Sequence, residues 1–153
     1  MNTQPDWTIE SRAHHQAVQF AEAANARDGA AVAELFTDDG VWELPGMAPV
    51  IGRRAIAEAF TTVIDGFDHL VQIVHPGVVS IGPDGVTARH YVTEFATRPS
   101  GSFLQAAVYD DVLNPVADWA FSSRQLRLLS KLPLPDATSS QPHRADSEGH
   151  RGV

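Results

Sequence analysis

Residues 35–44, LFTDDGVWEL, decide the fold because they combine the end of a helix, an acidic turn and the start of a strand. Apolar residues recur at helical spacing over residues 30–36, and the turn-forming residues 37–40 then stop the helix. Residues 41–44 are mostly apolar, with an aromatic side chain at Trp42, and suit a pleated, half-buried surface. The stretch therefore predicts a helix, an acidic turn and a first strand in direct succession.

The chain before this stretch has the pattern of one long helix. From Thr8 to Arg27, small and apolar residues recur at steps of three and four, which predicts an amphipathic helix with a narrow stripe for close packing on a sheet. Asp28 and Gly29 then end this helix. After the first strand, a loop that contains proline and glycine leads into a third helix over residues 53–64.

Four β-prone runs follow the third helix, separated by turn residues. They cover residues 70–81, 86–97, 103–113 and 119–128. Pro76 and Gly77 predict a bend within the first run, and Pro83-Asp84-Gly85 predicts a hairpin turn. Three helices followed by a strand meander predict an α+β fold, a cone-shaped barrel in which the helices pack on a strongly curved antiparallel sheet.

The length of 153 residues suits one domain, which we expect over residues 1–130. From Lys131 onward Pro, Ser, Asp, Arg and His dominate, so we expect residues 131–153 to form a disordered C-terminal tail. The loop from Thr97 to Ser102 is a candidate gate at the mouth of a pocket.

Composition narrows the classes of protein to consider. Hydrophobic residues make up 43% of the chain and charged residues 20%, which is typical of a soluble globular protein. The formal net charge of −8 disfavours binding to nucleic acid, and no apolar run is long enough to predict a membrane span. The acidic N-terminal residues argue against a secretory signal, and the zero cysteine count agrees with a cytoplasmic location and excludes thiolate chemistry.

Four further segments carry a family resemblance. They are residues 74–79 (VHPGVV), 84–89 (DGVTAR), 109–113 (YDDVL) and 119–124 (WAFSSR). With residues 35–44 they resemble the SnoaL-like polyketide cyclase family of the nuclear transport factor 2-like superfamily. The resemblance extends over about residues 8–130 and implies the cone-shaped fold, a hydrophobic, polyketide-like small-molecule substrate and a homodimer. Because this fold also hosts dehydratases, isomerases and non-enzymatic binders, it does not by itself imply one chemistry.

Relatives similar to scytalone dehydratase and to hexachlorocyclohexane dehydrochlorinase pair an aspartate near the end of the first helix with a histidine on the second strand. The matching positions here are Asn25 and Gln72, and neither side chain abstracts a proton at neutral pH. A shifted alignment brings His69 or His75 to the second position, with Asp28 as the carboxylate. We therefore expect no such pair, and predict that Asn25 and Gln72 bind substrate through hydrogen bonds.

Five residues on the predicted strands are candidate catalytic groups. His75 and His90 are candidates for a general acid or base, with a hydrogen-bonded strand histidine as the alternative for each. Glu94 is four residues from His90, so both side chains share one face of a strand. Tyr109 and Asp111 also share a face, where a phenol and a carboxylate can orient a carbonyl or a hydroxyl group. If these faces meet solvent instead, the same residues form ordinary polar strand surfaces.

Further residues are candidate substrate contacts. Trp42, Phe95 and Trp119 line a cavity if the sheet curls, and are core residues otherwise. Arg124, on the last strand, either points into the pocket or forms a surface ion pair.

Other polar residues fit structural roles better. Asp38 and Asp39 suit hydrogen bonds to local amides, and His14 and His15 suit the helix surface. The spacing of histidines predicts no metal site, and the glycines follow no phosphate-binding or dinucleotide pattern. We therefore predict chemistry without a metal or cofactor.

Three functional hypotheses follow. The first is a polyketide cyclase that folds its substrate in an apolar pocket and polarises a carbonyl by hydrogen bonding. The second is a dehydratase or isomerase with His75 or His90 as base and Glu94, Asp111 or Asp39 as its partner. The third is a ligand-binding or assembly module without chemistry, which a pocket too small for a drug-sized ligand favours.

Overall fold

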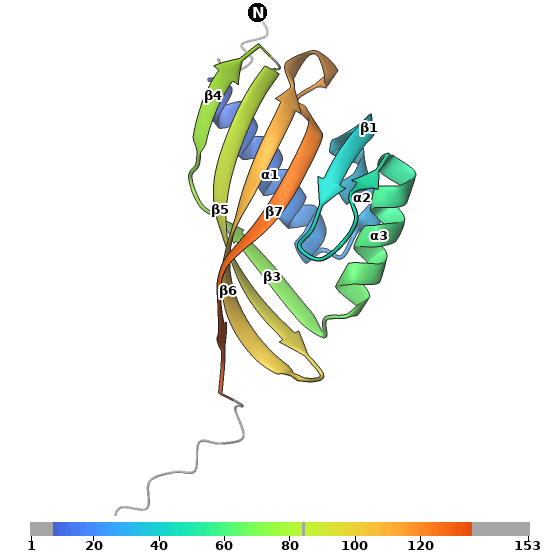
Figure 1. Ribbon diagram of the computed structural model, residues 1–153, viewed down its shortest axis with the longest axis vertical. Coiled ribbons are helices and arrows are strands. Elements are labelled where there is room, and N and C mark those ends of the chain that lie inside the picture. The colour runs from blue at the N-terminus through green and yellow to red at the C-terminus, as the bar shows by residue number, and fades with distance from the viewer. Residues whose placement is uncertain (1–7, 84, 136–153) are drawn as a thin grey trace, which may run out of the picture.

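A computed structural model describes residues 8–83 and 85–135 and shows helices packed against a curled, open sheet (Figure 1). The helical segments are α1 (Ile9–Asn25), α2 (Gly29–Glu34), α3 (Arg53–Asp65) and the 3₁₀ turn η1 (Pro115–Ala117). The strands are β1 (Phe36–Glu43), β2 (Val50–Ile51), β3 (His69–Val74), β4 (Val78–Gly82), β5 (Gly85–Arg98), β6 (Gly101–Asn114) and β7 (Ala120–Pro133). The predicted α+β class and cone-shaped fold are confirmed.

The first two helices begin at side-chain caps, as their sequences favour. Thr8 Oγ1 accepts a hydrogen bond from the backbone N–H of Ser11 at the start of α1, and Asp28 Oδ1 accepts one from Ala31 at the start of α2. The buried stripe of α1 consists mainly of small residues: Ala13, Gln16, Ala17, Phe20, Ala21 and Ala24. This stripe lets α1 lie close against the sheet. Among the described residues, no helix is both long and apolar enough to cross a membrane.

Within the described residues, the strands form one sheet in the order β2-β1-β7-β6-β5-β3, and β4 also pairs with β5. The bend after Val74 lets β3 pair with the second half of β5 and β4 with its first half. Most neighbours are antiparallel, but β1 runs parallel to β7. The expectation of a purely antiparallel sheet is therefore wrong. The parallel pair joins strands that are distant in sequence, and local turn signals say nothing about such pairs.

The predicted acidic turn lies inside β1. The second helix ends at Glu34, because the buried Phe36 already pairs with Phe121 of β7. The register then shifts between Phe36 and Val41, so residues 37–40 form an irregular part of the strand rather than a turn that precedes it. Gly40 is required there, because a Cβ atom would lie 2.9 Å from Phe36 Cβ.

The last strand is longer than predicted. β7 pairs with β6 through Gln105↔Lys131, Leu104↔Leu132 and Phe103↔Pro133. The strand therefore extends three residues beyond residue 130, after which the tail was expected to begin. The remainder of the expected tail, residues 136–153, lies outside the described residues.

The apolar core lies between the helices and the sheet face that packs against them, here called the inner face. Phe20 of α1 is its centre: its ring centroid lies 5.6 Å from that of Tyr109 and 6.3 Å from those of Phe36, Trp42 and Phe121. Any cavity between α1, α3 and the sheet is therefore bounded by aromatic side chains.

Candidate functional site

A cavity of about 80 Å³, here called the inner cavity, lies between α1, α3 and the inner face of the sheet. Its apolar walls are Phe20, Trp42, Leu44, Phe60, Val63, Ile64, Phe67, Leu70 and Leu126. Its polar groups are Gln72, Glu94, Gln105 and Tyr109. This volume is well below the roughly 300–1,000 Å³ of drug-sized sites.

Three of the polar groups form a row across neighbouring strands. Gln72 of β3 lies opposite Glu94 of β5, which lies opposite Gln105 of β6. Gln72 Nε2 donates to Glu94 Oε1 at 2.5 Å, and Gln105 Nε2 donates to Glu94 Oε2. Glu94 is only 3% exposed, and in residues 8–83 and 85–135 no cationic side chain forms an ion pair with it. Two neutral amides thus hold a buried carboxylate against an apolar cavity.

Tyr109 places a phenol beside this row. Its hydroxyl lies 3.5 Å from Gln72 Nε2, and its side chain is 1% exposed. Burial raises the pKa of Tyr109, and the nearby carboxylate of Glu94 raises it further, although the positive charge of Arg124 acts in the opposite direction. The phenol therefore keeps its proton and can donate a hydrogen bond into the cavity. Gln72 Oε1 is buried and has no hydrogen-bond partner among the described residues, so it is available as an acceptor.

Asn25 positions this row from the end of α1. Its Oδ1 accepts a hydrogen bond from the Gln72 backbone N–H at 2.7 Å, and its Nδ2 donates to the Gln72 carbonyl at 3.1 Å. Both hydrogen-bonding atoms of the side-chain amide are thus used by β3, and Asn25 does not line the cavity. The predicted direct contact of Asn25 with substrate finds no support in this geometry, whereas Gln72 does face the cavity.

A second polar cluster, here called the arginine cluster, lies elsewhere on the inner face and contains His14, His90, Asp111 and Arg124. The Arg124 guanidinium is fully buried, lies 3.6 Å from Asp111 Oδ1, and stacks 3.8 Å from the centroid of the Tyr109 ring. Burial lowers the pKa of His90 to about 4, assisted by the charges of Arg124 and His14. Burial also raises the pKa of Asp111 to about 6, although Arg124 opposes this shift.

The arginine cluster is distinct from the inner cavity. His90 and Glu94 do share the inner face, as their spacing predicts, but neither His90 nor Asp111 lines the cavity. Arg124 reaches the cavity only through its stacking on Tyr109. The expectation that His14 lies at the helix surface is wrong, because its ring packs 5.4 Å from that of His90 and its Nδ1 is buried.

The structure places three other predicted site residues away from the inner cavity. His75 is exposed, and its Nε2 forms a hydrogen bond with Thr93 Oγ1 at 2.8 Å. Phe95 is 46% exposed, on the face of β5 opposite to Glu94. Trp119 precedes β7 with φ of +62° and lies beneath the guanidinium of Arg12. Among the predicted aromatic contacts, Trp42 alone lines the cavity.

The sequence did not identify Gln105 as a site residue. The loop from Thr97 to Ser102, the predicted gate, does not line the inner cavity. Gln105 is four residues from Tyr109 on one strand, so alternation alone would have placed both on one face. Residues 99–100 form the turn between β5 and β6, and this end of the sheet borders a separate surface pocket rather than the inner cavity.

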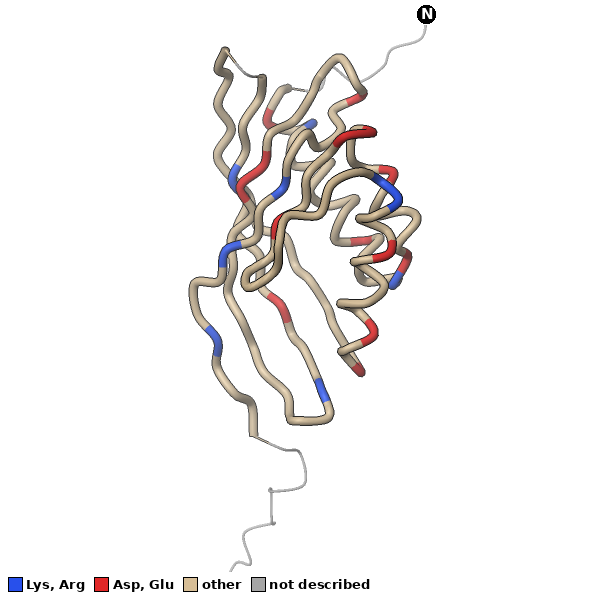
Figure 2. Tube along the Cα trace, turned by 45° about the vertical axis from the view of Figure 1, so that its right-hand side comes forward, with Lys and Arg blue, Asp and Glu red and all other residues tan. Residues whose placement is uncertain are grey.

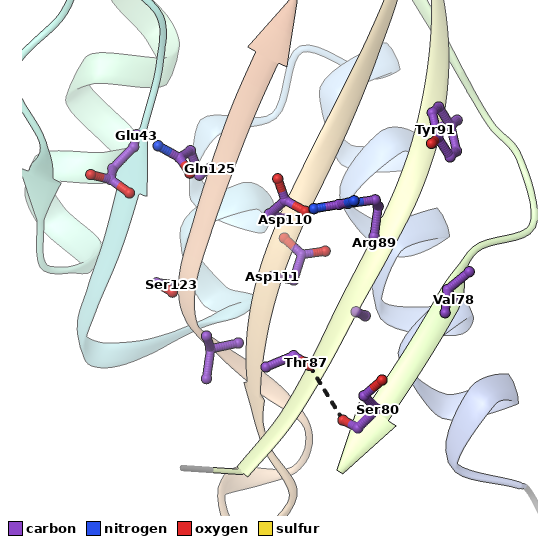
Figure 3. Close-up of a pocket in the computed structure, with 12 residues that line it drawn as sticks. Glu43, Val78, Ser80, Thr87, Arg89, Tyr91, Asp110, Asp111, Ser123 and Gln125 are labelled. Carbon is purple, nitrogen blue, oxygen red and sulfur yellow. Dashed lines mark hydrogen bonds and ion pairs between the residues drawn. The ribbon is translucent and has the colours of Figure 1, made fainter. Parts of the chain in front are cut away.

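A larger groove of about 560 Å³ lies on the opposite, outer face of the sheet (Figure 3). Asp110 accepts hydrogen bonds there from Arg89 at 2.6 Å and Arg127 at 2.8 Å. Partial burial acts to raise the pKa of Asp110, but the two arginines outweigh it and lower the pKa below its usual value. Figure 2 shows basic and acidic positions next to one another on neighbouring strands of the sheet. Because these charges satisfy one another, we take the smaller inner cavity as the candidate site.

Among the described residues, no group of three or more His, Cys, Asp or Glu side chains is arranged to hold a metal ion. The inner cavity offers one carboxylate, two amides and a phenol. These groups can accept a proton, orient a small molecule and donate a hydrogen bond to a developing negative charge.

Comparison with known proteins supports the fold. A family model described as the SnoaL-like domain matches residues 9–125. No curated protein matches the chain. Among solved structures, hexachlorocyclohexane dehydrochlorinase LinA-type3 from Novosphingobium barchaimii is 17% identical with a TM-score of 0.74, and the match covers 82% of this chain and 90% of that one.

Two further structures show the same likeness. An NTF2-like protein with a cystatin-like fold from Novosphingobium aromaticivorans is 25% identical with a TM-score of 0.60, over 79% of this chain and 80% of the other. A protein of unknown function from Mycobacterium tuberculosis is 21% identical with a TM-score of 0.66, over 89% and 79% of the two chains. The predicted nuclear transport factor 2-like superfamily is thereby confirmed.

Proposed function

The chain belongs to the SnoaL-like domain family, and from this premise we propose a cofactor-free isomerase or lyase that removes a proton next to a carbonyl group. Glu94 is the proposed general base, and Tyr109 donates a hydrogen bond to the oxygen that becomes negative. The observation that carries the proposal is the buried carboxylate of Glu94, which faces an apolar cavity without a cationic partner among the described residues.

The free energy of burial supports a functional reading of Glu94. Moving an ionised carboxylate into a protein interior costs several kcal/mol, and an opposite charge normally offsets part of this cost. Asp111, equally buried at 3% exposure, has Arg124 as such a partner. Among the described residues, the partners of Glu94 are the amides of Gln72 and Gln105.

The proposed mechanism uses each polar group of the cavity. Glu94 takes a proton from the carbon beside the substrate carbonyl, and the electron pair of the broken C–H bond forms an enolate. The hydroxyl of Tyr109 stabilises the enolate oxygen, while Gln72 and Gln105 fix the orientation of the carboxylate. Glu94 then returns the proton to a different carbon, or a leaving group departs from the β-carbon. A general base contributes about 10²–10⁴-fold to such a reaction, and one oxyanion donor about 10²–10³-fold.

The structural relatives are compatible with this chemistry. The name of the Novosphingobium barchaimii enzyme denotes removal of hydrogen chloride, an elimination that also requires loss of a proton. Its low identity shows a shared fold only. In this chain the proposed base is Glu94 on β5, rather than a histidine on β3.

A polyketide cyclase is a narrower version of the same proposal. Gln72 and Tyr109 would then polarise a carbonyl by hydrogen bonding, as the sequence suggested. The cavity of about 80 Å³ does not hold a whole polyketide, so such a substrate would have to extend beyond it. The same small volume favours the third hypothesis, a binding or assembly module without chemistry. Measuring whether Glu94 catalyses proton exchange distinguishes this module from an enzyme.

We also propose that the protein forms a homodimer and is located in the cytoplasm. The outer face of the sheet exposes large apolar side chains: Val71 and Ile73 of β3 and Tyr91 and Phe95 of β5 are 46–48% exposed. A second copy could cover such a surface. Light scattering after gel filtration would test this, since Phe95→Lys should shift a dimer toward monomer.

Exchange of carbon-bound protons tests the proposed base without knowledge of the natural substrate. We expect the wild-type protein in D₂O to accelerate deuterium incorporation next to the carbonyl of 2-butanone, followed by NMR. Glu94→Gln, which keeps the shape of the side chain, should abolish the acceleration, and Tyr109→Phe should reduce it. Exchange no faster than with the same concentration of acetate would contradict a catalytic role for Glu94.

A further inference from the structure

A surface pocket of about 450 Å³, here called the entrance pocket, lies directly beside the inner cavity. The loop after β1 contributes Pro45, Met47 and Pro49, and β7 contributes Leu128. The polar residues Glu43, Gln125 and Arg127 also line this pocket. Leu44 and Leu126 line both the entrance pocket and the inner cavity. These two side chains therefore form the partition between the two spaces.

The sheet pairing explains why an opening exists at this point. The parallel pairing of β1 with β7 ends at Glu43↔Gln125, whereas β7 continues to Pro133 alongside β6. Leu44 and Leu126 are the residues that follow this last pair. Leu126 also lies opposite Tyr109 in the β6–β7 register. Side chains, rather than backbone hydrogen bonds, thus close the gap between the end of β1 and the continuing edge of β7.

We propose that the entrance pocket is a second substrate subsite, and that Leu44 and Leu126 form a movable partition that determines how long a substrate the protein accepts. This inference rests on the proposed function. The substrate class it names is a carbonyl compound with a small reactive head and an extended apolar body. The head occupies the inner cavity beside Glu94, and the body lies against the prolines, Met47 and Leu128 of the entrance pocket.

The partition is a part of the cavity wall that can move without a shift of the backbone. Leu44 and Leu126 are only partly buried, and side-chain rotamers change without displacing the backbone. On the opposite side, Phe60 and Ile64 of α3 are 4% and 2% exposed, so an entrance there would require the helix to shift. Met47, 44% exposed, is a flexible side chain that can adapt to the body of a ligand.

The partition also reconciles the small inner cavity with a larger ligand. The volume of about 80 Å³ admits little more than a carbonyl group and its nearest carbons, but the neighbouring 450 Å³ lies within the range of small-molecule sites. A ligand that spans both spaces must displace Leu44 and Leu126. The size of these two side chains therefore weakens the binding of long ligands but not of short ones.

Binding of a short and a long ketone tests this inference. The probes are 2-butanone and 2-nonanone, and their dissociation constants are measured by NMR saturation transfer on the full chain. We expect Leu126→Ala and Leu44→Ala each to lower the Kd of 2-nonanone about tenfold, while the Kd of 2-butanone changes less than threefold. The matched control is Leu129→Ala on the same strand, since Leu129 is exposed and borders neither space.

The outcomes separate this inference from the proposed function. A 2-nonanone to 2-butanone Kd ratio in both partition variants equal to that of Leu129→Ala would overturn the partition, as would failure of both ketones to bind the wild-type protein. The proposed function is tested separately, by comparing proton exchange in the wild-type protein and in Glu94→Gln. Either result can fail without the other. Thermal unfolding identifies a variant that has lost its fold, and having two partition variants keeps the test decisive if one of them does.

Discussion

The inner face of the sheet carries two buried carboxylates that differ in how their charge is satisfied. Glu94 and Asp111 are both 3% exposed and lie on adjacent strands. Asp111 lies 3.6 Å from the Arg124 guanidinium and borders the outer groove, and neither of its carboxylate oxygens has a hydrogen-bond partner among the described residues. Glu94 lines the inner cavity, accepts hydrogen bonds from two neutral amides and forms no ion pair within the described part of the chain. The comparison teaches that burial alone does not identify a reactive group. The proposed role of Glu94 therefore rests on two features that Asp111 lacks, a position in the wall of the inner cavity and a buried carboxylate with no ion pair among the described residues.

The largest expected effect is on activity at Glu94. Glu94→Gln should reduce proton exchange by about 10²–10⁴-fold, because the general base is lost. The melting temperature should stay equal or rise, since the substitution removes a buried charge that has no cationic partner among the described residues. Thermal unfolding and the exchange rate measured on one sample would check this. A strong fall in both would make Glu94 a structural residue instead.

The opposite pattern is expected at Asp111. Asp111→Ala leaves the buried Arg124 guanidinium without its partner, which should lower the free energy of unfolding by about 3–5 kcal/mol. Urea unfolding would measure this loss. The double variant Asp111→Ala with Arg124→Met should recover part of it, because both charges are then absent. No recovery in the double variant would show that the pair does not interact as the structure indicates.

Local patterns in the sequence predicted which side chains share a strand face. The four-residue spacing of His90 and Glu94, and the two-residue spacing of Tyr109 and Asp111, placed each pair on one strand face. The helices and the bend at Pro76 followed from periodicity and turn chemistry. Which face became the interior did not follow, because that depends on where α1 packs.

Contacts between distant strands account for the rest. Asp111 meets Arg124 because the two are register partners across β6 and β7, and the Gln72–Glu94–Gln105 row joins three strands. Local sequence patterns do not predict pairings between strands that are distant in sequence. The same reason explains the parallel β1–β7 pair. It also explains the exposed His75, whose placement depends on how β3 and β4 share β5.

The third prediction uses the two titrating groups of the arginine cluster. The pKa of Asp111 is raised from 3.8 to about 6 in the folded state, so its contribution to stability falls as the pH rises from about 4 to about 6. The pKa of His90 is lowered from 6.5 to about 4, so its contribution rises over nearly the same range. The two slopes oppose each other. Each corresponds to roughly 3 kcal/mol at 1.36 kcal/mol per pKa unit.

Removing one group at a time should expose these slopes. Relative to wild type, His90→Phe should become less stable as the pH rises from 4 to 6, and Asp111→Asn should become more stable. Urea unfolding at several pH values gives the difference from wild type, in which the titration of other carboxylates cancels. If the stability difference from wild type did not change with pH in either variant, neither group would have a shifted pKa. The arginine cluster would then be a hydrated polar region.

The smallest expected effect concerns the support of the Glu94 row by Asn25. Asn25→Ala removes both hydrogen bonds to the Gln72 backbone and should lower the free energy of unfolding by about 2 kcal/mol, at roughly 1 kcal/mol per bond. Proton exchange should fall less than in Glu94→Gln, since the base itself remains. Asn25→Asp is the informative companion, because it keeps the acceptor for the Gln72 N–H and loses the donor to its carbonyl. If Asn25→Asp instead increased exchange, the carboxylate position near the end of α1 would have retained catalytic potential, and Glu94 would not be the sole base this pocket can use.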